Sequence, residues 1–177
     1  CCLVSLAVAP LYGQFLFGVK AGGTFARLQQ EAEGGYSWSS SYHTGLALNI
    51  YLANFSFGGF AVQAEALYNR KGREGLHLNY VEAPLGLIYL LNLGRVIPYI
   101  SVTPYYAFLL NVEAAEQDDV KTFAKSDYGV KLGGGVELRR FQISASRVWG
   151  IRNIAKDGNA VAHNLSTEIS MGYFFLR

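Results

Sequence analysis

Apolar and polar residues alternate in two segments near the end of the chain, residues 126–138 and 164–175. In the first segment, even positions carry mainly tyrosine, valine and leucine, and odd positions carry glycine or the charged residues Asp127, Lys131 and Glu137. A period of two is the pattern of a β-strand whose faces differ chemically. Glycine, serine and charge on one face suit a narrow barrel interior, and an apolar, aromatic face suits lipid. The alternation therefore predicts a membrane β-barrel.

Six other segments show a similar alternation, which makes eight candidate strands. The candidates are residues 15–26, 43–53, 59–69, 77–91, 96–110, 126–138, 141–151 and 164–175. Longer, more polar links follow the odd-numbered candidates, and tighter links follow the even-numbered ones. Outer-membrane barrels sort their connections in this way, with tight turns at the periplasmic end and long loops outside. We therefore expect an all-β fold, an eight-stranded antiparallel up-and-down transmembrane β-barrel over residues 14–177, with both termini periplasmic.

Two irregularities interrupt this pattern. Arg147 falls on the same face as Phe141, so either a bulge turns it inward or the assignment of the seventh strand is wrong. Three prolines, Pro84, Pro98 and Pro104, lie within candidate strands. Because proline has no N–H to donate to a strand ladder, we expect these residues at bulges or strand starts.

The composition favours a membrane protein over a soluble one. Of the 177 residues, 51% are apolar and 16% are charged, whereas roughly a quarter of the residues in a soluble domain are charged. The longest apolar run, residues 83–91, is about half of the ~20 residues that a spanning helix needs. Only a closed barrel then satisfies the backbone in lipid. The net charge of +2 is too small, and the basic residues are too scattered, for a nucleic-acid partner.

The first residues have a different character. Residues 1–13 begin with an apolar stretch from Cys1 to Pro10 and end in small residues before Gln14. This order is typical of the hydrophobic region and cleavage zone of a secretory signal peptide, so we expect a residual signal-peptide segment at 1–13. The alternative is a buried first strand. Both cysteines lie in this segment, so the mature domain would contain none.

Two consecutive segments resemble a known family. Residues 64–72 read Ala-Glu-Ala-Leu-Tyr-Asn-Arg-Lys-Gly, and residues 78–85 read Leu-Asn-Tyr-Val-Glu-Ala-Pro-Leu. This pair of strands, together with residues 17–22 and Arg147, resembles the PorT-like family of outer-membrane β-barrel domain proteins of Gram-negative bacteria. The resemblance implies a location in the cell outer membrane, contact with the lipid bilayer and the barrel-assembly machinery, and for some members a partner in secretion or gliding. The chain departs from such barrels at its end, where two residues follow Phe175.

Charged residues on the inward faces are the first candidate site. By strand parity they are Lys20, Glu65, Glu82, Lys131, Glu137 and Glu168, with Arg147 added if a bulge turns it inward. Eight strands enclose a space just wide enough for side chains, and a buried ion without a partner costs several kcal/mol. We therefore expect an interlocked charge network that closes the lumen. The functional alternatives are a narrow conduit and paired carboxylates for acid–base chemistry.

Aromatic and histidine side chains are the other candidates. Aromatic residues near strand ends predict an interfacial belt of Tyr51, Phe55, Phe57, Tyr89 and Tyr99. The histidines lie at the starts of candidate strands or directly before them, and we expect them as solvated residues at the external rim: His43, His77 and His163. Their spacing has no metal-ligand or catalytic signature. The long links are rich in polar and aromatic residues and could bind a partner.

These observations predict a non-enzymatic outer-membrane barrel with a side-chain-filled lumen and without catalytic residues, metal or cofactor. Such a protein would act as an envelope scaffold or as a docking or secretion-associated protein. Three alternatives stay open. A soluble lipocalin-like barrel that binds a small apolar ligand would place the apolar face inside, and a narrow porin would need an open lumen. An outer-membrane lipid-modifying enzyme would need a histidine within hydrogen-bond reach of a serine and a carboxylate.

Overall fold

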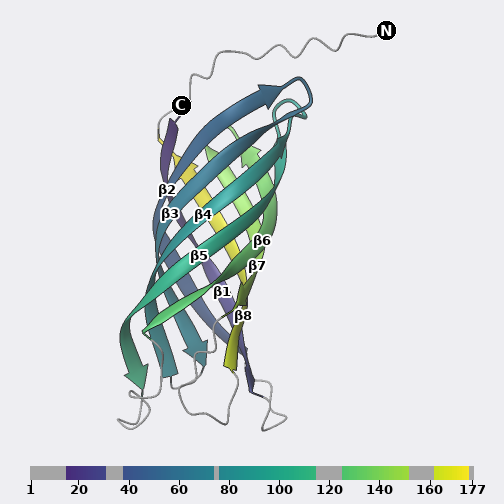
Figure 1. The fold of residues 1–177 in the computed structure, drawn as a ribbon. Coiled ribbons are helices and arrows are strands. Elements are labelled where there is room, and N and C mark those ends of the chain that lie inside the picture. Colours follow the sequence, from purple (N-terminus) through teal and green to yellow (C-terminus); the bar gives the residue numbers. More distant parts are fainter. Residues whose placement is uncertain (1–14, 31–37, 74–75, 115–124, 152–161, 176–177) are drawn as a thin grey trace.

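The computed structural model shows one closed β-barrel (Figure 1). The residues that it describes are 15–30, 38–73, 76–114, 125–151 and 162–175. The strands are β1 (Phe15–Gln30), β2 (Trp38–Phe55), β3 (Gly58–Arg73), β4 (Leu76–Leu91), β5 (Ile97–Ala114), β6 (Ser126–Leu138), β7 (Phe141–Gly150) and β8 (Ala162–Phe174). Each strand pairs antiparallel with the next, and β1 also pairs with β8, which closes the ring. The predicted eight-stranded antiparallel barrel is therefore confirmed.

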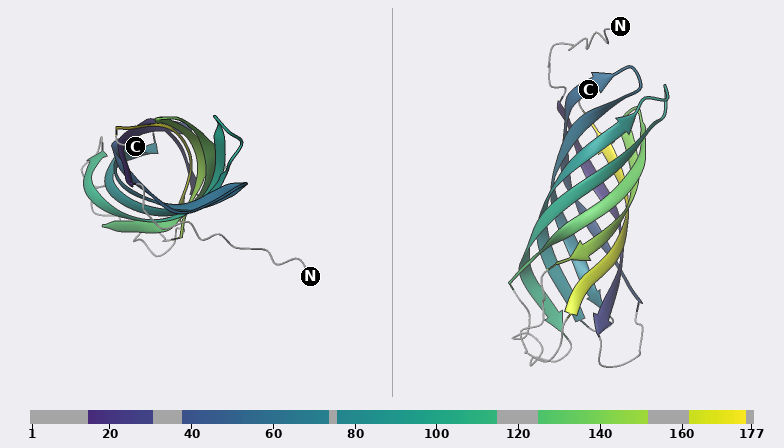
Figure 2. Two further views of the ribbon diagram at one scale, coloured as in Figure 1. Left: turned by 90° about the horizontal axis from the view of Figure 1, so that it is seen from above. Right: turned by 45° about the vertical axis from the view of Figure 1, so that its right-hand side comes forward.

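The strands are steeply tilted and form a tall, narrow cylinder (Figures 1 and 2). One end, here called the turn rim, carries the tight connections after β2, β4 and β6, together with the start of β1 and the end of β8. The opposite end is called the loop rim. Several strands extend further toward the loop rim than the alternation predicted, since β2 begins at Trp38 and β5 continues to Ala114. The part of a strand that extends beyond the lipid needs no apolar residues on its outer face, so the alternation of apolar and polar residues is lost there. No helix long and apolar enough to cross a bilayer occurs in the part of the chain that the structure describes.

The outward face of the barrel is apolar and its inward face is polar, as the alternation predicted. Ile169 exposes 51% of its surface on the outside, whereas Lys131 exposes 5% on the inside. Other exposed outward residues include Phe17, Leu46, Leu87, Val102, Leu132 and Met171, and other buried inward residues include Thr24, Asn49, Gln63, Glu82 and Glu168. A continuous apolar surface of this kind is stable against lipid but not against water. The soluble lipocalin-like alternative is therefore wrong.

The prolines lie where the strand ladders tolerate them. Pairing of β3 with β4 is interrupted between Leu85 and Glu82, which is where Pro84 lies. Pairing of β4 with β5 is interrupted around Pro104, and Pro98 is the second residue of β5. Proline has no N–H, so these local gaps remove the ladder bonds that it could not make.

The turn between β6 and β7 contains a strained residue. It consists of Arg139 and Arg140, and Leu138 pairs with Phe141 across it. Among the described residues, Arg139 is the non-glycine residue with a positive φ, 58°. A two-residue hairpin turn with positive φ at its first residue usually carries glycine there, because a Cβ is strained in this region. Arginine at this position therefore lowers the stability of the turn.

We expect Arg139→Gly to raise the free energy of unfolding by about 0.5–1 kcal/mol, because glycine adopts a positive φ without strain. Urea-induced unfolding from phospholipid vesicles, followed by tryptophan fluorescence, measures the change. The control is Arg140→Gly, which relieves no positive φ and should lower the free energy of unfolding by making the unfolded chain more flexible. A loss of stability in Arg139→Gly would contradict the strain at this turn.

Candidate functional site: the barrel interior

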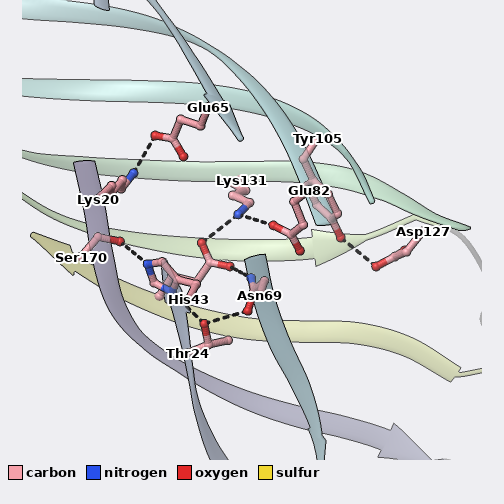
Figure 3. A network of polar contacts seen from close by, with 11 residues as sticks. Lys20, Thr24, His43, Glu65, Asn69, Glu82, Tyr105, Asp127, Lys131 and Ser170 are labelled. Atoms are coloured by element: carbon pink, nitrogen blue, oxygen red, sulfur yellow. Dashed lines mark hydrogen bonds and ion pairs between the residues drawn. The ribbon is translucent and has the colours of Figure 1, made fainter. Parts of the chain in front are cut away.

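Three charged residues from different strands meet inside the lumen, and Figure 3 labels two of them, Lys131 and Glu82. Lys131 of β6 places its Nζ 2.9 Å from Oε2 of Glu82 on β4 and 2.8 Å from Oε2 of Glu168 on β8. The same ammonium group lies 5.4 Å from the ring centroid of Tyr105. All three charged side chains are buried. Because burying an ion alone costs several kcal/mol, the two carboxylates depend on their shared cation.

A second set of polar contacts lies nearer the turn rim. Lys20 of β1 places its Nζ 2.7 Å from Oε1 of Glu65 on β3. Glu137 accepts hydrogen bonds from the Tyr51 hydroxyl at 2.8 Å and from Gln142 Nε2 at 3.2 Å. These contacts join β1 to β3, and β2 and β7 to β6. The interior is therefore cross-linked by polar side chains at more than one level.

His43 is buried in the lumen with 1% of its surface exposed, so the prediction of a solvated histidine at the external rim is wrong. Its strand begins five residues earlier than predicted, at Trp38, which places His43 within the inward-facing row. Its Nδ1 lies 2.9 Å from Thr24 Oγ1, and its Nε2 lies 2.8 Å from Ser170 Oγ (Figure 3). The extent of β2 thus decided whether this side chain faces water or the lumen.

The hydrogen-bond directions around His43 follow from Glu168, whose ionised carboxylate only accepts. Asn69 Nδ2 donates to Glu168 Oε1 at 3.0 Å, so Asn69 Oδ1 faces Thr24 and accepts from the Thr24 hydroxyl at 3.2 Å. His43 Nδ1 must then donate to Thr24 Oγ1. If the imidazole is neutral, its Nε2 accepts from the Ser170 hydroxyl. A continuous chain of hydrogen bonds therefore links Ser170 to the central ion pairs.

Apolar clusters close this polar interior at both rims. The cluster toward the loop rim contains Leu78, Tyr80, Tyr105, Ala107 and Val148. Two clusters toward the turn rim contain Ala61, Ile88, Leu90 and Tyr99, and Leu16, Ala47 and Phe174. At the loop rim, the Tyr105 hydroxyl also donates to Asp127 Oδ2 at 3.2 Å. Sequence reasoning missed these clusters, although the inward parity of the tyrosines was a signal for them.

Two of the five residues predicted for the aromatic belt lie inside the barrel instead. Tyr99 is 5% exposed within a turn-rim cluster, and Tyr51 donates its hydrogen bond into the lumen. Both occupy odd positions in strands whose even positions face outward. The face of the strand, and not nearness to its end, therefore decides that these two side chains lie inside. Phe55 and Phe57 face outward at the turn rim with their ring centroids 6.3 Å apart, and Tyr89 lies on the outward face of β4. Their role as an interfacial belt stays a prediction.

Arg147 does not join the charge network. β6 and β7 pair without interruption and place Leu132 opposite Arg147, so the bulge that would turn Arg147 inward is absent. The side chain is half-buried on the outward face, where Nη1 donates to Thr167 Oγ1 at 2.7 Å. An arginine on a lipid-facing surface costs about 2–4 kcal/mol at the bilayer midplane and less near the interfaces.

The interior has little free volume at its centre and more at the turn rim. A cavity of about 30 Å³ lies beside Lys20, Glu65 and Lys131, which is room for roughly one or two water molecules. A second cavity of about 350 Å³ opens at the turn rim, where Arg95 and Arg139 contribute to its lining. The cavity at the middle of the barrel therefore has room for little more than water, whereas the turn rim has a hollow.

Several predicted features lie outside the described residues. They are the signal-peptide segment 1–13, the side chains of His77 and His163, and most of the long links. Within the ranges that the structure does describe, no group of three or more histidine, cysteine, aspartate or glutamate side chains could hold a metal ion.

A closed ring of eight antiparallel strands with an apolar exterior and a polar, filled interior defines an outer-membrane β-barrel. Residues 9–156 match the family described as outer membrane protein beta-barrel domain, and the chain belongs to this family. The protein is therefore located in the outer membrane, in contact with the lipid bilayer. No curated protein matches the chain.

Several solved structures are similar to this chain over more than nine-tenths of its length. The N-terminal β-barrel domain of Pseudomonas aeruginosa OprF has a TM-score of 0.49 and 15% identity, over 92% of this chain and 99% of that chain. Ail of Yersinia pestis has a TM-score of 0.47 and 12% identity, over 92% and 99% of the two chains. OprG of Pseudomonas aeruginosa has a TM-score of 0.46 and 14% identity, over 93% and 97%. Identities this low transfer no activity or ligand to this chain.

We expect Lys131→Met to lower the free energy of unfolding by about 3–5 kcal/mol, because it leaves Glu82 and Glu168 buried without their shared cation. Urea unfolding from phospholipid vesicles measures the loss. The compensated variant Lys131→Met/Glu82→Gln/Glu168→Gln should regain most of it, since the three buried charges are gone. If Lys131→Met is as stable as the unaltered protein, the central ion pairs do not support the barrel.

Proposed function

We propose that this protein is a non-enzymatic, non-conducting outer-membrane barrel that serves as a scaffold in the envelope. In this role the barrel holds its loops at the cell surface and docks a partner protein of the envelope or of a secretion apparatus. The observation that carries the proposal is the filled lumen, in which Lys131 bridges Glu82 and Glu168 across the interior. A transport channel needs a continuous water-filled path, which larger barrels leave open and eight-stranded barrels fill with side chains.

The contacts at successive levels of the barrel support a closed lumen. Apolar clusters lie toward both rims, with ion pairs and hydrogen bonds between them. The central cavity of about 30 Å³ is far below the volume of an organic solute site, which begins at roughly 300 Å³. A narrow porin would require these contacts to part.

The cavity at the turn rim supports docking on the periplasmic side. Arg95 and Arg139 line it together with Asn54, and Glu137 lies in its wall. Guanidinium groups bind carboxylates through paired N–H donors. An acidic side chain of a periplasmic partner would suit this cavity. The PorT-like resemblance of residues 64–72 and 78–85 also favours a partner of this kind, and the aromatic end of β8 is the part that the barrel-assembly machinery would recognise.

The lipid-modifying enzyme is the weaker candidate, although Ser170 and His43 are within hydrogen-bond distance. The other nitrogen of His43 contacts the Thr24 hydroxyl. A catalytic triad needs a carboxylate at this position, and a hydroxyl group stands here instead. Ser170 is also buried inside the lumen, away from the lipid-facing surface on which an acyl substrate would lie. The geometry therefore supports a structural role for this pair.

In planar bilayers we expect the refolded protein to give no steady current above that of the bare membrane, because side chains fill the middle of its lumen. Heat-modifiability on a gel verifies that the inserted protein is folded. The matched control is Lys131→Ala/Glu82→Ala/Glu168→Ala, which shortens the central side chains and should raise the ion current if it folds. Steady current through the unaltered protein would contradict the proposal. Release of fatty acid from phospholipid vesicles that disappears in Ser170→Ala would contradict its non-enzymatic part.

A further inference from the structure

Two arginines from different turns line one cavity at the turn rim, the upper end of the barrel in Figure 1. Arg95 belongs to the connection between β4 and β5, and Arg139 belongs to the turn between β6 and β7. Ile97 of β5 pairs with Glu137 of β6, and each arginine lies two residues beyond this pair toward the rim. Within the described ranges, neither guanidinium group has a hydrogen bond or an ion pair. Two like charges that face one cavity repel each other, and an anion between them removes this repulsion.

The same cavity contains one carboxylate. Glu137 lies in its wall and is 8% exposed, and it accepts hydrogen bonds from Tyr51 and Gln142. Two arginines and one glutamate leave one positive charge in excess among the lining residues. A ligand with one negative charge neutralises this excess, whereas a phosphate monoester with nearly two negative charges would exceed it beside Glu137. The Glu137 carboxylate itself can only accept hydrogen bonds, so it favours a ligand that also carries N–H donors.

The part of the cavity below the arginines is apolar. Leu16, Ile97 and the ring of Tyr51 line it. These three side chains belong to the two turn-rim clusters or pack against them, so they form a firm apolar floor. The volume of about 350 Å³ falls in the range of ligand sites, which begins at roughly 300 Å³. An apolar side chain next to the negative group of a ligand would be buried on this floor.

The cavity lies in the mouth of the barrel and not on its lipid-facing wall. Leu16 and Glu137 are buried on the inward face, whereas their neighbours Phe15 and Leu138 are exposed on the outside. Lipid headgroups surround the ring from outside, and the tight turns of such barrels face the periplasm. The occupant of this cavity therefore approaches from the periplasm.

We propose that the turn-rim cavity binds a segment of a periplasmic protein in which an acidic residue adjoins an apolar residue. The carboxylate of that segment lies between Arg95 and Arg139, whose paired N–H donors match its two oxygens. The apolar side chain packs on Leu16 and Ile97, and a backbone N–H of the segment donates to Glu137. This inference rests on the proposed docking role and specifies which sequence the docked partner presents.

Binding of short peptides to the refolded barrel tests the proposal. The protein is reconstituted in phosphatidylcholine nanodiscs, which leave the turn rim accessible and carry no net charge. The probe is the end-blocked peptide Gly-Gly-Leu-Asp-Gly-Gly with a zwitterionic rhodamine dye, and fluorescence anisotropy measures its affinity. We expect replacement of its aspartate by asparagine to weaken binding at least about 10-fold, because hydrogen bonds to a charged group are lost. Replacement of its leucine by glycine should weaken binding about 5-fold, because less apolar surface is buried.

Variants of the two arginines locate the site. Arg95→Gln/Arg139→Gln should bind the aspartate and asparagine peptides equally. The matched control is Arg140→Gln, which removes a positive charge from the same turn but does not line the cavity and should keep the preference for aspartate. Heat-modifiability verifies that each variant is folded, and Arg95→Gln alone provides the comparison if the double variant fails to fold.

The proposal is overturned if the aspartate and asparagine peptides bind equally to the unaltered protein, or if the preference persists in folded Arg95→Gln/Arg139→Gln. Equal loss in Arg140→Gln would indicate general attraction to a basic rim and would also overturn it. Inorganic phosphate, compared with chloride at equal ionic strength, should not displace the peptide; if it does, the site takes a small anion. Nanodiscs with phosphatidylglycerol should bind the peptide as well as phosphatidylcholine nanodiscs at a salt concentration that screens general repulsion. Loss of binding there would make a lipid headgroup the occupant.

This inference and the proposed function fail separately. Absence of peptide binding would remove the turn-rim site but would leave a non-conducting barrel that can dock a partner through its loops. Steady current in planar bilayers would contradict the proposed function and would leave a measured preference for the aspartate peptide unchanged.

Discussion

Pairing of β1 with β8 is the constraint on which the rest of the structure depends. A bilayer offers no water to backbone N–H and C=O groups, so an open sheet edge in lipid is not viable. The ladder from Gly18 opposite Phe174 to Gln30 opposite Ala162 removes that edge. Once the ring is closed, every strand has one face toward lipid and one toward the lumen. The apolar exterior and the polar interior are both consequences of this closure.

The small circumference of the ring brings together residues that are far apart in the sequence. Lys131 lies 49 residues from Glu82 and meets it across the lumen, and Lys20 meets Glu65 at a separation of 45 residues. Charges that would be solvated in an open sheet are forced to pair here, because no water layer separates them. The same pairing that supports the barrel also places side chains across the middle of the lumen.

Lys131 and Arg147 show how the face of a strand decides the partner of a charge. They lie on adjacent strands, and Lys131 pairs with Val148 while Leu132 pairs with Arg147, so their registers differ by one position. One residue of offset sends the lysine inward and the arginine outward. The protein itself supplies two carboxylates to the lysine. The arginine lies on the outward face, where its guanidinium group donates a hydrogen bond to the Thr167 hydroxyl.

The amino-acid sequence by itself determined the number of strands, their order and the chemistry of their two faces, because a period of two is a local property of the chain. Only the tertiary structure decided the environments of His43 and Arg147. For His43 the deciding fact was how far β2 extends toward the loop rim, and for Arg147 it was an unbroken register. Strand ends and register are set by pairing between strands, and such pairing depends on the closed ring rather than on any local pattern.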